Sequence, residues 1–306
     1  MRFRDKVVWV TGASSGIGEA LAIAFSREGA RVVLSSRNEK ELERVRDACD
    51  DAAASSPAPL TRPSATLSPL RGARALQAEP SPRARGEGAR SADEGRAPTS
   101  HLIAPLDLTQ QDAIARVTAE VLRKVGHVDV LVHSGGVSQR SLAADTTVAT
   151  DRAIMDVNFF GTVALTKAVL PSMLARKSGH IVPISSVVGY VGTPLRSAYS
   201  ASKHALHGFF DSLRAEVAKD GIDITIVCPG YIRTNVSRNA LTGDGSAFGK
   251  MDRTHDRAML PEECARRIVN AVAKRKQELV VGGKETWAVP LMRFTPRLVA
   301  RMVRMK

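Results

Sequence analysis

The sequence predicts an α/β fold: a single domain in which a doubly wound parallel sheet of seven strands is flanked by helices. Two observations predict it. Short apolar runs alternate with longer amphipathic stretches along most of the chain, and 306 residues, of which 43% are hydrophobic, suffice for one well-buried core. We assign residues 1–290 to this domain and expect ligands at the C-terminal ends of its strands.

The elements follow one another in regular alternation. The predicted strands are 7–10, 31–35, 101–106, 128–132, 179–184, 223–227 and 278–281, and the predicted helices are 16–28, 39–48, 111–125, 151–175, 198–219 and 261–275. In the first helix Ile17, Leu21 and Phe25 recur on one face, as a helix that packs on a sheet requires. Such alternation implies parallel strands joined by right-handed crossovers.

A low-complexity insertion, residues 51–100, interrupts this pattern. It consists mostly of Ala, Pro, Ser, Arg and Gly, has seven of the fifteen prolines, and lacks Val, Ile, Phe, Tyr and Trp. Such a segment cannot bury enough apolar surface to offset the entropy of ordering, so we expect a disordered surface insertion. The alternative, a basic interaction segment, is disfavoured because five acidic residues nearly balance the charge of its seven Arg.

Composition argues against several other classes of protein. The net charge is +13, but the basic residues are scattered and not interleaved with aromatic residues, so no nucleic-acid partner is predicted. Cys49, Cys228 and Cys264 are far apart, which predicts neither a disulfide framework nor a metal site. With no run resembling a signal peptide or a transmembrane helix, we expect a cytoplasmic protein.

The C-terminal tail, residues 291–306, is basic and apolar and contains no acidic residue. On a helix, Arg297, Arg301 and Arg304 would share one face, and the apolar side chains would lie elsewhere. This pattern fits an amphipathic helix lying on a membrane surface as a peripheral contact. A helix that packs on its own domain or on a sister subunit fits it equally well.

A glycine-rich turn joins the first predicted strand to the first helix. Gly12 permits the tight turn, and Gly16 and Gly18 allow backbone and helix to approach a pyrophosphate. Free N–H groups and the helix dipole would meet the phosphate charge. The context predicts a Rossmann-type dinucleotide site; its remaining candidate contacts in the turn are Ser14, Ser15 and Ile17.

The end of the second predicted strand distinguishes NAD from NADP. An acid there would bind both ribose hydroxyls of NAD and repel a 2′-phosphate. Ser36 occupies this place, and Arg37 follows with a guanidinium suited to that phosphate. The sequence therefore predicts NADP(H) as the cofactor.

The candidate catalytic groups lie in the second half of the chain. Tyr199 and Lys203 are four residues apart and so share one face of a predicted helix. A tyrosine exchanges protons poorly at neutral pH unless a nearby cation lowers its pKa. Ser186, thirteen residues upstream, could donate a hydrogen bond to a substrate carbonyl, and Asn158 is a polar residue among apolar neighbours in mid-helix.

These motifs, in this order and spacing, resemble the short-chain dehydrogenase/reductase superfamily. The resemblance implies that Tyr199 exchanges a proton with the substrate, that Ser186 orients the substrate oxygen, and that Lys203 binds the nicotinamide ribose and lowers the tyrosine pKa. It implies that Asn158 holds a water linking Lys203 to solvent. It also implies further cofactor contacts at Asp107, Leu108, Gly135, Pro229, Gly230, Ile232 and Thr234.

Three segments, 134–142, 197–205 and 228–235, are similar to the subgroup called dehydrogenase/reductase family members 7 and 7B. That similarity implies a lipophilic carbonyl substrate such as a steroid or retinoid, and the superfamily often forms dimers and tetramers. One departure is His133, where the family usually has an Asn that ties neighbouring strands together. We expect His133 to do so less well.

The expected function is interconversion of a carbonyl and an alcohol. Residues 189–195 are expected to form an apolar wall beside Ser186, with Val137 and Met251 nearby, and residues 235–259 a mobile lid. Reduction of a 3-oxoacyl group on a carrier protein is an alternative, because a basic surface could dock an acidic carrier. A non-catalytic cofactor-binding or membrane-surface scaffold is the alternative of another class.

Overall fold

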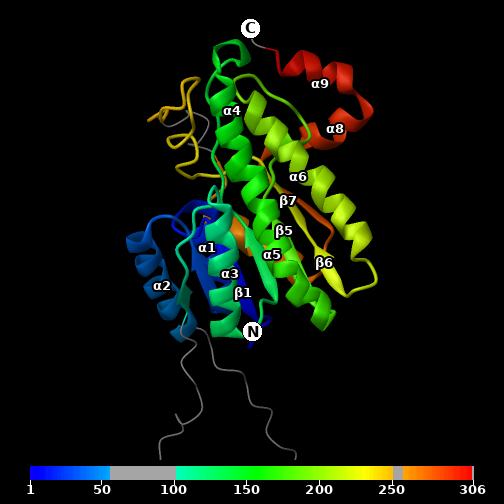
Figure 1. Ribbon diagram of the computed structural model, residues 1–306. Coiled ribbons are helices and arrows are strands. Elements are labelled where there is room, and N and C mark those ends of the chain that lie inside the picture. The colour runs from blue at the N-terminus through cyan, green and yellow to red at the C-terminus, as the bar shows by residue number, and fades with distance from the viewer. Residues whose placement is uncertain (56–100, 251–257, 305–306) are drawn as a thin grey trace, which may run out of the picture. The chain divides into compact units, whose positions relative to one another are not determined.

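The computed structural model describes residues 1–55, 101–250 and 258–304, which include a parallel six-stranded sheet between two layers of helices (Figure 1). The strand order is β3-β2-β1-β4-β5-β6. These strands are β1 (Val7–Thr11), β2 (Arg31–Ser35), β3 (Leu102–Ile103), β4 (Val130–His133), β5 (Gly179–Pro183) and β6 (Ile222–Ile224). A second parallel pair joins β7 (Ile226–Pro229) to β8 (Glu278–Val281).

Helices occupy all the regions where the alternation predicts them, and two further short helices follow near the C-terminal end of the described chain. They are α1 (Gly16–Arg27), α2 (Glu39–Ala54), α3 (Gln111–Val125), α4 (Val148–Met155), α5 (Gly161–Arg176), α6 (Ser197–Glu216), α7 (Pro261–Ala273), α8 (Ala288–Phe294) and α9 (Pro296–Met302). The Rossmann-type α/β fold predicted from the sequence is thereby confirmed. Its strand order reverses between β1 and β4, which is where such sheets bind ligands.

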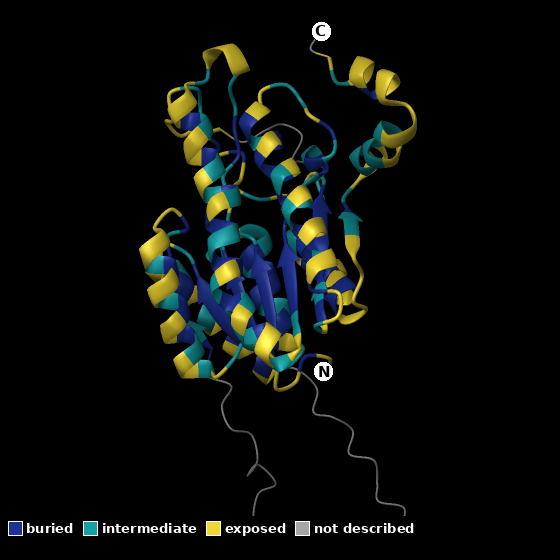
Figure 2. Cartoon of the chain, turned by 45° about the vertical axis from the view of Figure 1, so that its right-hand side comes forward, coloured by how far each residue is buried: buried dark blue, intermediate teal, exposed yellow. Residues whose placement is uncertain are grey.

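Each face of the sheet has its own apolar core. Because side chains alternate along a strand, Val8 and Val10 of β1 face one core while Trp9 faces the other. The first core includes residues of α1, α2 and α7, such as Phe25. The second includes residues of α3, α5 and α6, such as Phe210. Figure 2 shows the central strands of the sheet buried and the helices that flank it exposed along their outer sides.

The predicted seventh strand does not join the main sheet. The predicted strand 223–227 is divided at Thr225, whose N–H donates to Ile181 O at 3.0 Å and whose hydroxyl donates to Lys276 O. Beyond Thr225, β7 keeps one bridge to the end of β5, between Ile184 and Val227, and forms its ladder with β8 instead. A single polar residue that binds both neighbours therefore divides one predicted strand into two.

The predicted helix 151–175 is also divided. The chain forms α4, then one π-helical turn at Asp156–Phe160, then α5. At the start of α5, a Cβ on Gly161 would lie 2.3 Å from the carbonyl oxygen of Leu108, so this helix passes very close to the loop after β3. The wider turn sits at that crossing and contains the buried side chain of Asn158.

The start of the predicted insertion and the C-terminal tail differ from expectation. Helix α2 continues to Ala54, with Ala52 and Ala53 buried, so residues 51–54 belong to the domain and not to the insertion. Residues 56–100 lie outside the described residues. The tail forms two short helices, because Pro296 has no N–H to continue α8 and instead begins α9.

His133 occupies the position where the family usually has a strand-tying Asn. Its Nε2 lies 2.8 Å from the hydroxyl of Thr166, so its side chain ties β4 to α5 and not to a neighbouring strand. Within the described residues its buried Nδ1 has no hydrogen-bond partner. The backbone ladders of β4 with β1 and β5 are nevertheless complete over its length.

Buried histidines should make the fold sensitive to acid. Burial lowers the pKa of His133 to about 3 and that of His180 to about 4, from an ordinary value of 6.5. The folded chain therefore holds both rings neutral while the unfolded chain protonates them below pH 6.5. The free energy of unfolding should fall by about 1.4 kcal/mol per pH unit for each ring between pH 6 and 5.

The variant His133→Asn removes one of these groups. Urea unfolding at pH 7.5, 6 and 5 should show a shallower decline for this variant than for the wild type, whatever its stability at pH 7.5. Parallel declines in the two proteins would contradict the assignment of a neutral, buried His133.

Candidate active site

A cleft of about 1080 Å³ runs along the C-terminal ends of the strands and brings together nearly all the predicted site residues. The predicted residues that line it are Gly12, Ser14, Ser15, Gly16, Ile17, Gly18, Arg37, Asp107, Leu108, Gly135, Ser186, Tyr199, Lys203, Pro229, Gly230, Ile232 and Thr234. Asn158 is buried behind the cleft wall. Residues from both halves of the chain thus meet at one place.

The glycine-rich turn has the geometry of a phosphate cradle. Gly12 has a φ of 66°, and a Cβ there would lie 2.7 Å from the backbone nitrogen of Gly135. A Cβ on Gly18 would lie 2.2 Å from the carbonyl oxygen of Gly12. Within the described residues, the side chain of Ser15, the residue before α1, makes no cap bond, which leaves the first N–H groups of the helix for a ligand. These features fit a dinucleotide pyrophosphate.

The end of β2 forms the far end of the cleft. Ser35 is buried, and its hydroxyl is already hydrogen-bonded within the protein. It accepts from Trp9 Nε1 at 2.8 Å and donates to Ala104 O at 2.6 Å. Ser36 and Arg37 follow on the cleft wall, as the sequence predicts. Glu39, in the first turn of α2, also lines this end and was missed in the sequence.

The loop after β3 holds two further predicted cofactor contacts. The carboxylate of Asp107 accepts from the N–H and the hydroxyl of Thr109, both at 2.9 Å. These bonds shape the turn that presents Asp107 and Leu108 to the cleft.

Tyr199 and Lys203 lie one turn apart near the start of α6, with Lys203 Nζ 5.7 Å from the centre of the Tyr199 ring. Lys203 Nζ donates to Ile184 O at 2.8 Å. Ser186 follows β5, and its hydroxyl is close enough to the Tyr199 phenol to lower the pKa of that phenol. The Ser186 hydroxyl also lies 3.3 Å from Pro229 O, to which it donates. The three side chains therefore converge on one point of the cleft.

Burial controls the ionisation of this group. It raises the pKa of Tyr199, against the opposing effects of the Ser186 hydrogen bond and of the charges of Arg196 and Arg140. It lowers the pKa of Lys203 to about 8. The groups that favour the phenolate in the free protein are thus a serine and two arginines. The predicted effect of Lys203 on the tyrosine pKa stays a prediction for the cofactor-bound state.

Asn158 connects the cleft wall to α6. Its Oδ1 accepts from Val137 N at 2.8 Å, and its Nδ2 donates to Val137 O and Ser202 Oγ, both at 2.9 Å. A Cβ built on Gly136 would lie 3.1 Å from Asn158 Oδ1 and 3.7 Å from Lys203 Nζ, so the two side chains flank this glycine. The predicted water between Asn158 and Lys203 stays a prediction.

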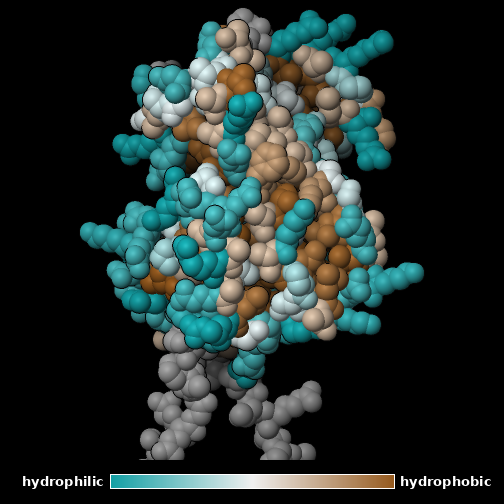
Figure 3. Space-filling view, in the orientation of Figure 1, coloured by the Kyte–Doolittle hydropathy of each residue, from teal (hydrophilic) through white to brown (hydrophobic). Residues whose placement is uncertain are grey.

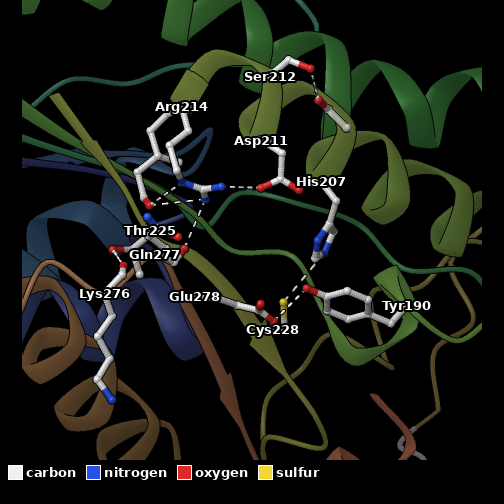
Figure 4. Close-up of polar contacts among 12 residues, drawn as sticks. Tyr190, His207, Asp211, Ser212, Arg214, Thr225, Cys228, Lys276, Gln277 and Glu278 are labelled. Carbon is white, nitrogen blue, oxygen red and sulfur yellow. Dashed lines mark hydrogen bonds and ion pairs between the residues drawn. The ribbon is translucent and has the colours of Figure 1, made fainter. Parts of the chain in front are cut away.

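Beyond Tyr199 the cleft lining combines apolar side chains with polar ones, among them Ser138, Thr193 and Asn239. It also includes Val157, Val187, Val188, Val191, Leu241, Ala288 and Val303, together with Arg140 and Arg196. The predicted wall of residues 189–195 is only partly confirmed, because Val191 and Thr193 line the cleft whereas Gly189, Tyr190, Gly192, Pro194 and Leu195 do not. Figure 4 shows why for Tyr190: its hydroxyl points to Glu278 on β8, to which it donates at 2.7 Å, and its ring packs against His207.

The predicted lid is partly described. Val137 lines the cleft as expected, and so do Val236, Ser237 and Asn239, whereas Met251 lies outside the described residues. The chain from 235 to 250 is held to the rest of the domain by a bridge between Leu241 and Gln139. Its mobility stays a prediction.

Several lining residues gave no signal in the sequence. Ala288 comes from the start of α8 and Val303 from the tail, and Arg140 and Arg196 stand in loops more than 50 residues apart. Gln139 is fully buried beside them. Their positions depend on how distant segments pack, which local patterns do not encode.

Comparisons with known proteins agree with this geometry. A family model described as short chain dehydrogenase matches residues 6–65 and 72–244. The chain is 40% identical over 302 residues to dehydrogenase/reductase SDR family member 7B of Rattus norvegicus, covering 98% of this chain and 81% of that protein. It is 43% identical over 276 residues to dehydrogenase/reductase SDR family protein 7-like of Drosophila melanogaster, covering 90% and 72%.

A solved structure is also similar. The short-chain dehydrogenase from Streptomyces avermitilis has a TM-score of 0.72 and 27% identity to this chain, covering 97% of this chain and 96% of that one. The chain belongs to the short-chain dehydrogenase/reductase family, close to its member 7 and 7B proteins. It is thus an oxidoreductase family member, and its fold implies a nicotinamide cofactor.

Proposed function

We propose that this protein uses NADP(H) to interconvert a carbonyl group and a primary or secondary alcohol on a lipophilic substrate, with Tyr199 as the general acid and base. The observation that carries the proposal is the convergence of Tyr199, Ser186 and Lys203 between a phosphate cradle and a part of the cleft that several valines line.

The bound nicotinamide supplies a hydride in reduction and accepts one in oxidation. In reduction, the Tyr199 hydroxyl gives its proton to the carbonyl oxygen, so hydride and proton together make the alcohol. Ser186 turns its hydroxyl from Pro229 O toward the same oxygen and stabilises the developing charge. Lys203, whose pKa is near neutral, holds a proton beside Tyr199. In oxidation the phenolate takes the alcohol proton.

The choice of NADP(H) rests on Arg37. It lines the cleft at the end of β2, and the neighbouring Ser36 carries no charge that would repel a 2′-phosphate. Glu39 is the opposing feature on the same wall, and the carboxylate would disfavour that phosphate if it faced the ligand.

The variant Arg37→Gln should therefore raise the KM for NADPH at least about tenfold, since a charge-assisted bond to a phosphate is lost. The KM for NADH should stay within twofold. The matched control is Lys40→Gln, which removes an exposed cation of α2 three residues further along the chain. It should change neither the KM for NADPH nor the KM for NADH. Equal effects of Arg37→Gln on the two cofactors would overturn the assignment.

The proposal of a lipophilic substrate is supported by the valines that line the cleft beyond Tyr199, together with Ala288 and Val303 from the C-terminal end of the described chain. A panel of a steroid ketone, retinal and an acetoacetyl thioester, followed by NADPH oxidation, identifies the class. Turnover confined to the thioester would favour carrier-protein reduction instead. NADPH binding without turnover of any carbonyl would favour the non-catalytic scaffold.

Removal of the Tyr199 hydroxyl tests the proton transfer. Tyr199→Phe should lower kcat by about 10²–10⁴-fold while the Kd for NADPH changes less than twofold. Tyr190→Phe removes a hydroxyl of the same type that points away from the cleft, and it should keep wild-type kcat. Wild-type kcat in Tyr199→Phe would contradict the role.

The tail also supports a peripheral membrane contact. Phe294, Leu298 and Met302 are exposed, Phe294 by 79%, and they are interspersed with Arg293, Arg297, Arg301 and Arg304. Only Val299 of α9 is buried. This mixture suits an anionic lipid surface. Cosedimentation with anionic but not neutral vesicles is expected, and failure with both would exclude the contact.

The stretch Val148–Arg176 is long and apolar enough to cross a membrane, but a single helix of this kind is weak evidence because core helices have the same composition. Its inner residues, such as Leu165, belong to the second core. The cytoplasmic location stays a prediction from composition.

The outer face of α5 and α6 suits a second copy of the chain. Hydrophobic side chains gather over these helices (Figure 3). Phe160 is 49% exposed, and the partly buried rings of Phe159 and Phe209 pack edge-to-face beside it. A dimer or tetramer is the expected state, and a monomer in sedimentation equilibrium would contradict it.

A further inference from the structure

The start of helix α6 needs polar partners that its own sequence does not provide. The first N–H groups of any helix have no acceptor inside the helix. The residue that precedes α6, Arg196, makes no side-chain cap bond within the described residues. Ala198 is buried, so its N–H is largely withdrawn from water. The helix that carries Tyr199 and Lys203 therefore depends on an acceptor from elsewhere in the chain.

Gln139 supplies that acceptor from the loop after β4. Its Oε1 accepts from Ala198 N at 2.8 Å and from Tyr199 N at 3.3 Å. Its Nε2 donates to the hydroxyls of Thr146 at 3.0 Å and Ser197 at 3.3 Å. The residue is 0% exposed. Both lone pairs and both protons of the carboxamide are used, which fixes its orientation.

We propose that Gln139 is a positioning residue for the reaction, because its buried side chain caps α6 in trans and holds the backbone of Tyr199 in place. The inference rests on the proposed role of Tyr199. The hydrogen bond from the Tyr199 N–H to Gln139 fixes the position of the Tyr199 backbone, and so of the Cα atom from which the phenol side chain extends. A small displacement of a reacting group from the substrate costs much of the rate.

The same residue also connects Tyr199 to the substrate side of the cleft. Arg140 N donates to Leu241 O at 2.8 Å, and Leu241 N donates to Ser138 O at 2.9 Å. These bonds pair the chain around Gln139 with residues 235–250, the segment that follows the cleft residues Ile232 and Thr234. Movement of that segment on substrate binding would therefore reach Tyr199 through one buried side chain.

Three variants distinguish a positioning role from ordinary core filling. Gln139→Met keeps the length of the side chain but has no acceptor. Gln139→Glu keeps the acceptor, and the hydroxyls of Thr146 and Ser197 can rotate to donate to it, but it adds a negative charge beside Tyr199. Thr147→Val is the matched control: it removes the side-chain cap of α4, where Thr147 Oγ1 accepts from Thr150 N at 3.2 Å.

Expected results differ for the three. Gln139→Met should lower kcat at least tenfold with the Kd for NADPH within twofold of wild type. Gln139→Glu should keep at least a third of the optimal kcat and shift the kcat–pH profile for alcohol oxidation to higher pH, since a nearby anion disfavours the phenolate. Thr147→Val should lower the unfolding temperature without changing either kcat or its pH profile.

A spectroscopic measurement makes the test independent of turnover. The chain has three tyrosines, and all of them contribute to the phenolate absorbance near 295 nm. Each protein is therefore titrated alongside the same protein carrying Tyr199→Phe, and the difference between the two absorbance curves gives the titration of Tyr199 alone. Its pKa should rise in Gln139→Glu. If no carbonyl is turned over but this pKa moves, the proposed function fails while the positioning contact stands.

Wild-type kcat in a folded Gln139→Met would overturn the proposal. If that variant does not fold, an unshifted titration of Tyr199 in Gln139→Glu would overturn it equally.

Discussion

A buried ammonium group is the constraint on which the rest of the site depends. Lys203 is only 5% exposed, and its Nζ donates to Ile184 O at the end of β5. A cation withdrawn from water is costly unless polar groups and charges surround it, and here its pKa falls to about 8. Strand β5, helix α6 and the loop after β4 must therefore converge at this point, with Tyr199 and Gly136 on two of its sides.

The same burial works against the proton transfer that we propose for Tyr199. It raises the pKa of the phenol, and the chain opposes this only with the hydroxyl of Ser186 and the more remote charges of Arg196 and Arg140. On the proposed mechanism, the remaining decrease would come with the positively charged nicotinamide and with Lys203. The proposal therefore couples proton transfer to the presence of the cofactor.

Much of the fold and most of the site could be predicted from the sequence, because both depend on local patterns. The turn with Gly12 and Gly18, the strand before it and the helix after it lie together in the chain, and so do Tyr199 and Lys203. Features that depend on contacts between distant segments could not be predicted. Thr225 divides a strand only because Ile181 and Lys276 lie on either side of it.

The residues that the sequence missed have the same origin. Gln139 looks like an ordinary loop residue until α6, almost 60 residues later, places two N–H groups against it. The π turn around Asn158 arises where α5 crosses the loop of Leu108. The tail was expected as one helix, and Pro296 alone would have indicated the break, since proline favours the first turn of a helix and interrupts the middle.

Titration of the Tyr199 phenol with and without NADP⁺ tests the central claim most directly. In the free protein its pKa should lie above the ordinary value of 10, because burial outweighs the groups that favour the phenolate. Saturating NADP⁺ should lower that pKa by at least about two units, through the nicotinamide charge and Lys203. A pKa that is the same with and without NADP⁺ would contradict the assignment of Tyr199 as the general acid and base.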